Sequence, residues 1–349
     1  MSAAADNATW MAHETAESGD AVARLLGQSG DAIRAAGKLL RDLDPRLVAI
    51  CARGSSNHAA AFFKYATETR LGLPVVAIGP SIASVYQTPL RLDGAAMLLI
   101  SQSGRSPDLL AMAKAAQQGG ARIIAIVNDA ASPAAEMADL TIPLQAGPEK
   151  SVAATKSCIA SMAAGLALLA GWSKDRALED ALTALPDALR AAAAVDWSEM
   201  LAPFVAARST LIIGRGIGYP VAMEAALKLK ETASLHAEPY SAAEVLHGPI
   251  QIVQQGFPVL LFRQRDAASE SLDHCAARLA DAGARVFVAG AEAGAAKNVT
   301  HLPVAPSVHP ATELLSAMVT CYGTVDRIAR ARGFDPDTPP LLKKVTETL

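Results

Sequence analysis

The sequence turns on the stretch Ser101-Gln102-Ser103-Gly104-Arg105-Ser106, which follows the apolar run 95–100 and precedes a helical pattern over 107–118. These polar residues therefore lie where a buried strand is expected to turn into a helix. Backbone N–H groups lack acceptors at a helix start, and the helix dipole favours an anion there. Short hydroxyl side chains add donors without bulk. Locally, two interpretations fit equally well: a phosphate-binding cradle, or a serine-rich turn that caps a helix.

The composition indicates a well-packed α/β protein with two domains. The chain has 349 residues and is 51% hydrophobic but only 4% aromatic. No apolar run approaches the roughly 18–20 residues of a membrane span. Residues 1–17 lack the basic and apolar regions of a signal peptide. The net charge of −3 argues against nucleic acid as a partner.

The cysteines and histidines predict neither a disulfide framework nor a metal site. The cysteines are far apart and form no CxxC pair, as expected of buried thiols in a reducing cytoplasm: Cys51, Cys158, Cys275 and Cys321. His236 and His247 lie near acidic residues, but no metal-ligand spacing recurs. We therefore expect a cytoplasmic protein without metal or cofactor.

Strands alternate with helices through the first half of the chain. Helices are expected over 9–43 (in two patterns), 59–71 and 107–118, and strands over 47–52, 74–78, 95–100, 121–127 and 140–144. This alternation predicts a parallel, doubly wound sheet, in which ligands bind beyond the carboxyl ends of the strands. The polar turns at Gly54 and Gly104 both fall on that edge. A polar loop over 147–156 then leads into an apolar helix, and two helical patterns flank Pro186, where we place the domain connection.

The second half repeats the first. The pair Arg215-Gly216 follows Arg53-Gly54 at an offset of 162 residues, and the run 259–264 matches 97–102 at the same offset. One residue later in register, 283–288 matches 120–125. Three matches in register indicate an internal duplication, and the period is far longer than that of a solenoid repeat. We expect a first domain over 1–190, a second over 191–334 and an extended tail over 335–349.

The two copies differ at the turn after the central strand. The second copy has Arg263-Gln264-Arg265 where the first has Ser101-Gln102-Ser103, so only the first keeps small hydroxyls that can close around a phosphate. The second copy carries an ionisable run instead: Glu224, Lys228, Lys230, Glu231, His236, Glu238, Glu244 and His247. One copy is therefore expected to hold an anion and the other to supply acid–base groups. A charged helix face with pairs such as Glu224–Lys228 explains the run equally, and we favour it for Glu224 and Lys230.

Taken together, these segments resemble the sugar isomerase (SIS) domain family. In particular, they resemble the isomerase half of glucosamine-6-phosphate synthase and glutaminase-less glucosamine-6-phosphate deaminases. The matching segments span nearly the whole chain: 54–56, 101–106, 146–149, 152–156, 214–216 with 219–220, 226–231, 247–249 and 342–346. The resemblance implies two tandem doubly wound parallel-sheet SIS domains, flavodoxin-like or Rossmann-like, with an extended C-terminal tail.

The resemblance also implies residue roles. Six residues would hold the sugar phosphate: Ser55, Ser56, Ser101, Gln102, Ser103 and Ser106. Val152 and Ala153 would contact the sugar. Glu231 would move the proton between C1 and C2, with Lys228 assisting. His247 would open the sugar ring, reaching in from a neighbouring subunit, and Lys344 would contact the carbonyl carbon or form a Schiff base with it.

The chemistry of these residue types agrees with those roles. One carboxylate can remove and return a proton at adjacent carbons, a histidine titrates near neutrality, and a desolvated lysine attacks carbonyls. His247 could instead be a helix cap or a core histidine, although the Gly248-Pro249 that follows favours the functional role. A lysine in a tail is ordinarily exposed. Ala154, Leu246 and Arg105 depart from the usual serine, lysine and glutamate of the synthases.

We expect an isomerising amino-sugar-phosphate deaminase that converts glucosamine 6-phosphate and water into fructose 6-phosphate and ammonia, because no glutaminase segment precedes the SIS segments. We also expect a homodimer with shared active sites. The alternatives are a synthase-like isomerase of the glutamine–fructose-6-phosphate transaminase type, a related enzyme for galactosamine 6-phosphate or a glycated amino acid phosphate, and a non-catalytic sugar-phosphate sensor. The presence of Glu231, His247 and Lys344 argues against the sensor. Hydroxyl recognition depends on geometry, so the sequence leaves the sugar epimer open.

The tail is expected to be extended. Its proline-rich start, 335–340, cannot be helical. Leu341 and Leu342 then offer an apolar anchor before Lys343 and Lys344. Such a tail could carry Lys344 into a cleft and lower its pKa by excluding water, with Lys343 on the opposite side.

Overall fold

The structure is a computed structural model that describes residues 8–290 and 299–344. The chain divides into two compact units. The first-sheet unit comprises Asp20–Glu149 and Lys156–Pro186. The second-sheet unit comprises the described residues up to Gly19, the loop Lys150–Thr155, and the described part of Asp187–Lys344.

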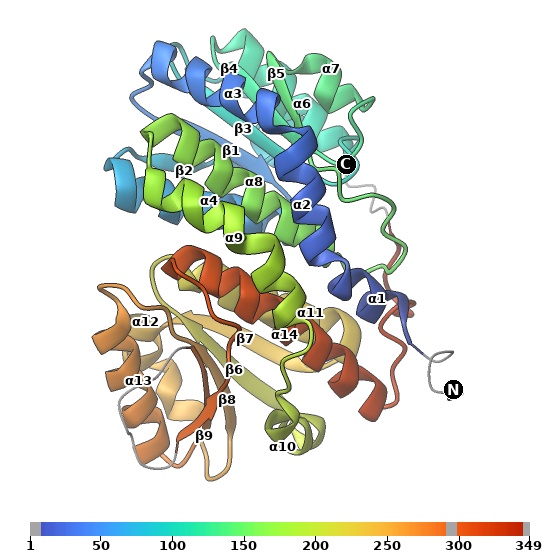
Figure 1. Cartoon of the computed structure of the whole chain (residues 1–349), viewed down its shortest axis with the longest axis vertical. Helices are drawn as coiled ribbons and strands as arrows, with labels where there is room; N and C mark the ends of the chain where they lie inside the picture. Colours follow the sequence, from blue (N-terminus) through green and yellow to red (C-terminus); the bar gives the residue numbers. More distant parts are fainter. Residues whose placement is uncertain (1–7, 291–298, 345–349) are drawn as a thin grey trace. The chain divides into compact units, whose positions relative to one another are not determined.

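The first-sheet unit is a three-layer sandwich around a parallel five-stranded sheet (Figure 1). The strands are β1 (Val48–Ala52), β2 (Val75–Ala77), β3 (Ala96–Ser101), β4 (Arg122–Val127) and β5 (Leu140–Pro143), in the order β2-β1-β3-β4-β5. One face carries α3 (Gly30–Leu43), α4 (Gly54–Leu71) and α8 (Lys156–Ser173), and the other carries α5 (Ser81–Ser84), α6 (Pro107–Gln118) and α7 (Pro133–Met137). The near-continuous apolar strands follow from burial on both faces.

The second-sheet unit is also built on a parallel five-stranded sheet. Its strands are β6 (Ser209–Gly214), β7 (His236–Ser241), β8 (Pro258–Phe262), β9 (Arg285–Ala289) and β10 (Val299–Leu302), in the order β10-β9-β8-β6-β7. Helices α11 (Gly218–Ala233) and α14 (Pro310–Ala331) cover one face, and α12 (Ala242–Leu246) and α13 (Ser269–Asp281) cover the other (Figure 1). The short helices α1 (Trp10–Ala16) and α10 (Leu201–Ala206) pack on α14.

The two sheets share one topology and one register, which confirms the duplication. Read from the β7 edge, the second order repeats that of the first, which is the flavodoxin-like order. Ala49 pairs with Met97, and 162 residues later Leu211 pairs with Val259. The next pairing shifts by one residue, since Met97 pairs with Ile123 but Val259 pairs with Val286. The one-residue shift seen in the sequence is therefore a real difference in chain length between the third and fourth strands.

Two helix boundaries differ from the expectations. Helix α4 begins at Gly54 rather than at residue 59, so the expected turn over 54–58 is the first helical turn. Helix α9 (Arg176–Ala192) runs unbroken through Pro186, where two helical patterns were expected. A proline inside a helix costs about 3 kcal/mol. Burial of leucines on one face, at about 1.5–3 kcal/mol each, offsets that cost: Leu178, Leu182, Leu185 and Leu189.

The described part of the tail forms neither helix nor strand, as expected. The expected apolar anchor is wrong, however, because Leu341 is 94% exposed and Leu342 is 41% exposed. Polar contacts described below hold the tail instead. Within 8–290 and 299–344, no helix combines the length and the apolar character needed to cross a bilayer.

Candidate functional site

The first-sheet unit brings the predicted phosphate residues together at the carboxyl edge of its sheet. Strands β1 and β3 are parallel neighbours, and Ala52 pairs with Ile100. Because the strands end at the same level, the β1–α4 turn with Ser55 and Ser56 lies beside the β3–α6 turn that begins at Ser101. This is the point where the strand order reverses, at which doubly wound sheets bind ligands.

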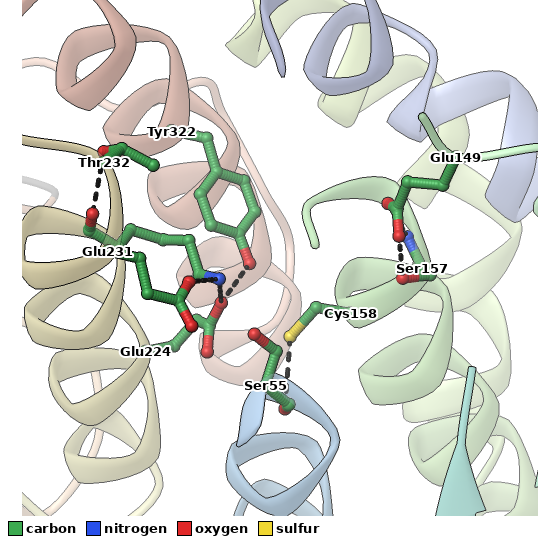
Figure 2. Close-up of polar contacts among 9 residues, drawn as sticks. Ser55, Glu149, Ser157, Cys158, Glu224, Glu231, Thr232 and Tyr322 are labelled. Carbon is green, nitrogen blue, oxygen red and sulfur yellow. Dashed lines mark hydrogen bonds and ion pairs between the residues drawn. The ribbon is translucent and has the colours of Figure 1, made fainter. Parts of the chain in front are cut away.

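The β1–α4 turn presents helix-start donors. Gly54 adopts the left-handed region at φ +50°, and the first helical hydrogen bond runs from Asn57 N–H to the Arg53 carbonyl. The N–H groups of Gly54, Ser55 and Ser56 precede that bond, so they have no acceptor within the helix. The Ser55 carbonyl, in turn, accepts the Cys158 thiol of α8 at 3.5 Å (Figure 2). This contact joins the β1–α4 turn to α8.

The β3–α6 turn is shaped by its own side chains. Ser101 Oγ accepts the Gly104 N–H at 3.0 Å, and Ser103 Oγ accepts the Arg105 N–H at 3.3 Å. Both hydroxyls therefore use an acceptor site on the turn and keep their hydrogen as a donor. Gly104 lies at φ +63°, and a Cβ there would fall 2.2 Å from Ser132 Oγ. Only glycine fits at this position of the turn.

An ion pair joins the two turns. Arg53 Nε donates to Asp108 Oδ2 at 2.7 Å, and Asp108 is 1% exposed at the start of α6. Ser106 is the N-cap residue of α6 and makes no capping bond with its side chain. Burial raises the pKa of the nearby Cys51 thiol to about 12, with Asp108 adding to the rise and Arg53 opposing it. This thiol is therefore no nucleophile at neutral pH.

In the second-sheet unit, a buried lysine connects two carboxylates on helix α11. Lys228 is 1% exposed, and its Nζ donates to Glu231 Oε2 and lies 3.6 Å from Glu224 Oε1 (Figure 2). Glu231 keeps 24% of its side chain exposed, so a carboxylate fixed by Lys228 remains partly accessible. The expected Glu224–Lys228 and Lys228–Glu231 pairs are thus present.

The face that carries these pairs is not a solvated one, which corrects the expectation for Glu224. Its side chain is 0% exposed, and Glu224 Oε1 accepts the Tyr322 hydroxyl of α14 at 3.0 Å. Lys230, by contrast, is exposed. Tyr322 was missed by the sequence reasoning because it lies 98 residues from Glu224. The one available signal was the apolar setting of Glu224, which is followed by Ala225 and Ala226.

The loop Lys150–Thr155 and the tail meet within the second-sheet unit. Lys344 Nζ donates to the Ser151 carbonyl at 2.5 Å, next to the predicted sugar contacts Val152 and Ala153. Val152 N–H in turn donates to the Asp337 carbonyl at 3.2 Å. The structure therefore brings Lys344 together with two of the predicted sugar-binding residues.

In the first-sheet unit, Glu149 lies just before the loop Lys150–Thr155 and binds the start of α8, which lies just after the loop. Its carboxylate accepts both the N–H of Ser157, at 3.1 Å, and the Ser157 hydroxyl, at 2.6 Å (Figure 2). This contact satisfies donors at the start of α8. Glu149 lay in a recognised motif but was not among the predicted site residues.

His247 lies apart from Glu231. It is exposed and follows α12, whose Val245 packs with α13 in the core on one face of the second sheet. Helix α11 with Glu231 covers the other face (Figure 1). The alternative that His247 is a core histidine is excluded by its exposure. In the part of the chain that the structure describes, no group of three or more histidine, cysteine or acidic side chains is placed to bind a metal.

The SIS domain profile matches residues 43–171 and 204–320 of the chain. The chain belongs to the SIS domain family. It is 34% identical over 311 residues to the glutamine–fructose-6-phosphate aminotransferase (isomerizing) of Zymomonas mobilis, and 34% identical over 361 residues to that of Mycolicibacterium smegmatis. These matches cover 85% and 96% of the chain but only 51% and 57% of the relatives. This SIS chain thus spans about half the length of the curated relatives it matches.

Solved structures share the fold. A Silicibacter pomeroyi protein assigned as a phosphosugar isomerase has a TM-score of 0.90 and 47% identity, covering 95% of this SIS chain and 100% of that one. The glucosamine-6-phosphate deaminase of Thermotoga maritima has a TM-score of 0.69 and 19% identity, covering 94% and 99%. At that identity the second likeness shows the fold alone.

Proposed function

We propose that this SIS protein is a phosphosugar isomerase acting on an amino-sugar phosphate, and that it works as an isomerising deaminase on glucosamine 6-phosphate. The observation that carries the proposal is that the buried Lys228 ammonium holds the carboxylate of Glu231 while the Glu231 side chain stays 24% exposed. A base fixed in this way can serve two adjacent carbons without moving far.

The proposed reaction starts from the open-chain aldehyde. Glu231 removes the proton from C2 and returns it to C1, which converts the aldose into the 2-imino ketose. Water then adds at C2 and ammonia leaves, so that the products are fructose 6-phosphate and ammonia. Lys344 contacts the C2 imine carbon or forms a Schiff base with it; in the second case its amine displaces ammonia at C2, and water then hydrolyses the resulting ketimine to fructose 6-phosphate and the free lysine. Lys228 orients Glu231 and assists transfer of a proton from the C2 amine to the C1 oxygen.

The cradle of the first-sheet unit supports a phosphorylated substrate. Its donors are the helix-start N–H groups of Ser55 and Ser56 and the hydroxyls of Ser101, Ser103 and Ser106, with Gln102 beside them. Each charge-assisted hydrogen bond to a phosphate contributes about 1.5–3 kcal/mol. Val152 and Ala153 would contact the sugar.

A release assay tests the reaction. Ammonia and fructose 6-phosphate are measured from glucosamine 6-phosphate, galactosamine 6-phosphate, a glycated amino acid phosphate and unphosphorylated glucosamine. We expect equimolar products from glucosamine 6-phosphate and none from glucosamine. Binding without turnover of any sugar would identify a sensor and overturn the proposal.

The second candidate runs the same chemistry toward amino-sugar synthesis. It is favoured by the relatives named as aminotransferases. Incubation of fructose 6-phosphate with ammonium salt at several concentrations distinguishes the two. If, at millimolar ammonium, the protein forms glucosamine 6-phosphate faster than it deaminates it, amino-sugar synthesis is favoured.

We further propose that His247 opens the sugar ring in the active site of a neighbouring subunit of a homodimer. This fits the exposure of His247 and its place on the face of the sheet opposite Glu231. Glu231→Gln and His247→Ala proteins, each inactive alone, should regain part of the activity when their subunits exchange. Proven exchange without recovery would place both residues in one subunit's site.

A further inference from the structure

We infer that Glu14 and Asp337 are positioning residues that set the place of the Lys344 amine by gripping the loop Lys150–Thr155. This inference deepens the proposed function and rests on it. The contacts form a closed circuit from the tail to helix α1, from α1 to the loop, and from the loop back to the tail, all within the second-sheet unit.

The first link joins the tail to helix α1. The Asp337 carboxylate accepts the N–H of Trp10 at 2.7 Å and that of Met11 at 2.8 Å. These donors belong to the first turn of α1, where N–H groups lack partners within the helix. Thr9, the N-cap residue, donates its hydroxyl to the buried Asp326 of α14. Helix α1 is therefore fixed both to the body of the unit and to the tail.

The second link joins α1 to the loop. Glu14 is 3% exposed, and its two carboxylate oxygens accept the N–H groups of Lys150 and Ser151, the latter at 3.2 Å. The Lys150 ammonium also lies 3.7 Å from the centre of the Trp10 ring, which adds a cation–π contact between the same two segments. One carboxylate thus fixes two successive peptide N–H groups of a segment that has no helix or strand.

The third link closes the circuit through one peptide group. In the Ser151–Val152 peptide, the N–H donates to the Asp337 carbonyl at 3.2 Å, and the carbonyl accepts Lys344 Nζ at 2.5 Å. A trans peptide is planar, with its N–H and C=O pointing in opposite directions. Asp337 and Lys344 therefore lie on opposite edges of this peptide, and the tail passes around it.

The consequence is that Glu14 acts on Lys344 through the loop. Rotation of the Ser151–Val152 peptide would move the acceptor that holds the amine; the Asp337 carbonyl restrains this peptide directly, and Glu14 fixes the two N–H groups that precede it. A long lysine side chain in irregular backbone otherwise loses considerable rotamer freedom when it is brought to a reacting carbon. The circuit fixes it before substrate arrives.

Glu14→Gln tests the inference, because an amide keeps the shape but presents an NH₂ group to one of the two N–H donors. We expect kcat to fall 10- to 100-fold, and borohydride trapping of substrate on Lys344 to slow in parallel, with KM for the phosphosugar changed less than threefold. Asp337→Asn should act in the same direction. Glu17→Gln removes an exposed carboxylate just past the end of α1 and should change neither quantity.

A double-variant comparison separates positioning from general stability. If Glu14 acts through Lys344, then adding Glu14→Gln to Lys344→Ala should cause no further loss of kcat. An additive loss, or a loss that appears only with a large fall in melting temperature, would overturn the inference. If Lys344→Ala itself leaves turnover unchanged, the proposed role of Lys344 fails, and amide hydrogen exchange then tests whether Glu14 holds the loop. The Lys150 and Ser151 amides should exchange faster in Glu14→Gln than in the unaltered chain. Unchanged exchange rates would overturn the inference.

Discussion

The turn after β3 and its counterpart after β8 occupy the same place in two copies of one fold, yet only the first is open. Gln102 and Gln264 are separated by the 162-residue offset. Gln102 is partly exposed beside hydroxyls that can donate to a phosphate. Gln264 is 0% exposed, and its Nε2 donates to the Arg215 carbonyl at 2.8 Å. A glutamine thus lies partly exposed beside the hydroxyls of the first turn, whereas the equivalent glutamine of the second turn is buried.

A glycine lies against the buried glutamine of the second copy. A Cβ at Gly218 would lie 2.7 Å from Gln264 Oε1, so a larger residue there would displace the Gln264 amide. The first copy has Ser56 at the corresponding position, 162 residues earlier. Ser56 is also one of the residues that we propose to hold the sugar phosphate.

The two arginines that flank Gln264 in the second turn also bind carboxylates. Arg263 makes a bidentate pair with Asp273 at 2.7 and 2.9 Å, and Arg265 Nε donates to Glu313 at 2.9 Å. Hydrogen bonding to Asp273 raises the pKa of the Arg263 guanidinium above its ordinary value. The arginines of the second turn are therefore engaged with carboxylates, and helix α11 of that copy carries the proposed base.

The largest effect is expected at that base. Glu231→Gln keeps the hydrogen bond to Lys228 but removes the proton acceptor, so kcat should fall at least ~10³-fold, within the range of general base catalysis. KM should change little. The measurement is fructose 6-phosphate release, with Glu199→Gln, an exposed carboxylate elsewhere in the unit, as the control. Turnover above one tenth of normal would remove Glu231 from the chemistry.

A smaller but still large effect is expected in the first turn. Ser101→Ala with Ser103→Ala removes two hydroxyl donors, and at about 1.5–3 kcal/mol each kcat/KM should fall ~10²-fold or more, mainly through KM. Turnover of unphosphorylated glucosamine, if detectable at all, should not change. An unaltered KM would show that the turn is an ordinary helix cap.

The smallest effect on activity is expected from Gly218→Ser, which recreates the first copy's residue in the second. The serine displaces the Gln264 amide, so the free energy of unfolding should fall by about 1–3 kcal/mol. kcat and KM should remain within twofold of normal, because we place the phosphate at the first turn and not at the second. Urea unfolding and the release assay give the two quantities; normal stability would mean that glycine is not required there.

The sequence was sufficient for the features that depend on local pattern. The alternation of strands and helices predicted the parallel doubly wound sheets, and the offset of the repeats predicted the duplication; the one-residue shift between the repeats recurs in the strand pairing. It was insufficient where contacts join distant segments. Glu224 with Tyr322 and Glu14 with Lys150 are 98 and 136 residues apart, and only the fold brings them together. The two helical patterns expected around Pro186 form one helix, because burial of leucine side chains outweighs the free-energy cost of a proline inside α9.

The most direct test of phosphate binding at the first turn is calorimetric titration of fructose 6-phosphate into three proteins: the unaltered chain, the Ser101→Ala/Ser103→Ala variant and the Gly218→Ser variant. We expect one binding site per chain, a dissociation constant raised ~10²-fold or more in the double serine variant, and an unchanged constant in Gly218→Ser. Two sites per chain, or full affinity after loss of both serine hydroxyls, would contradict it.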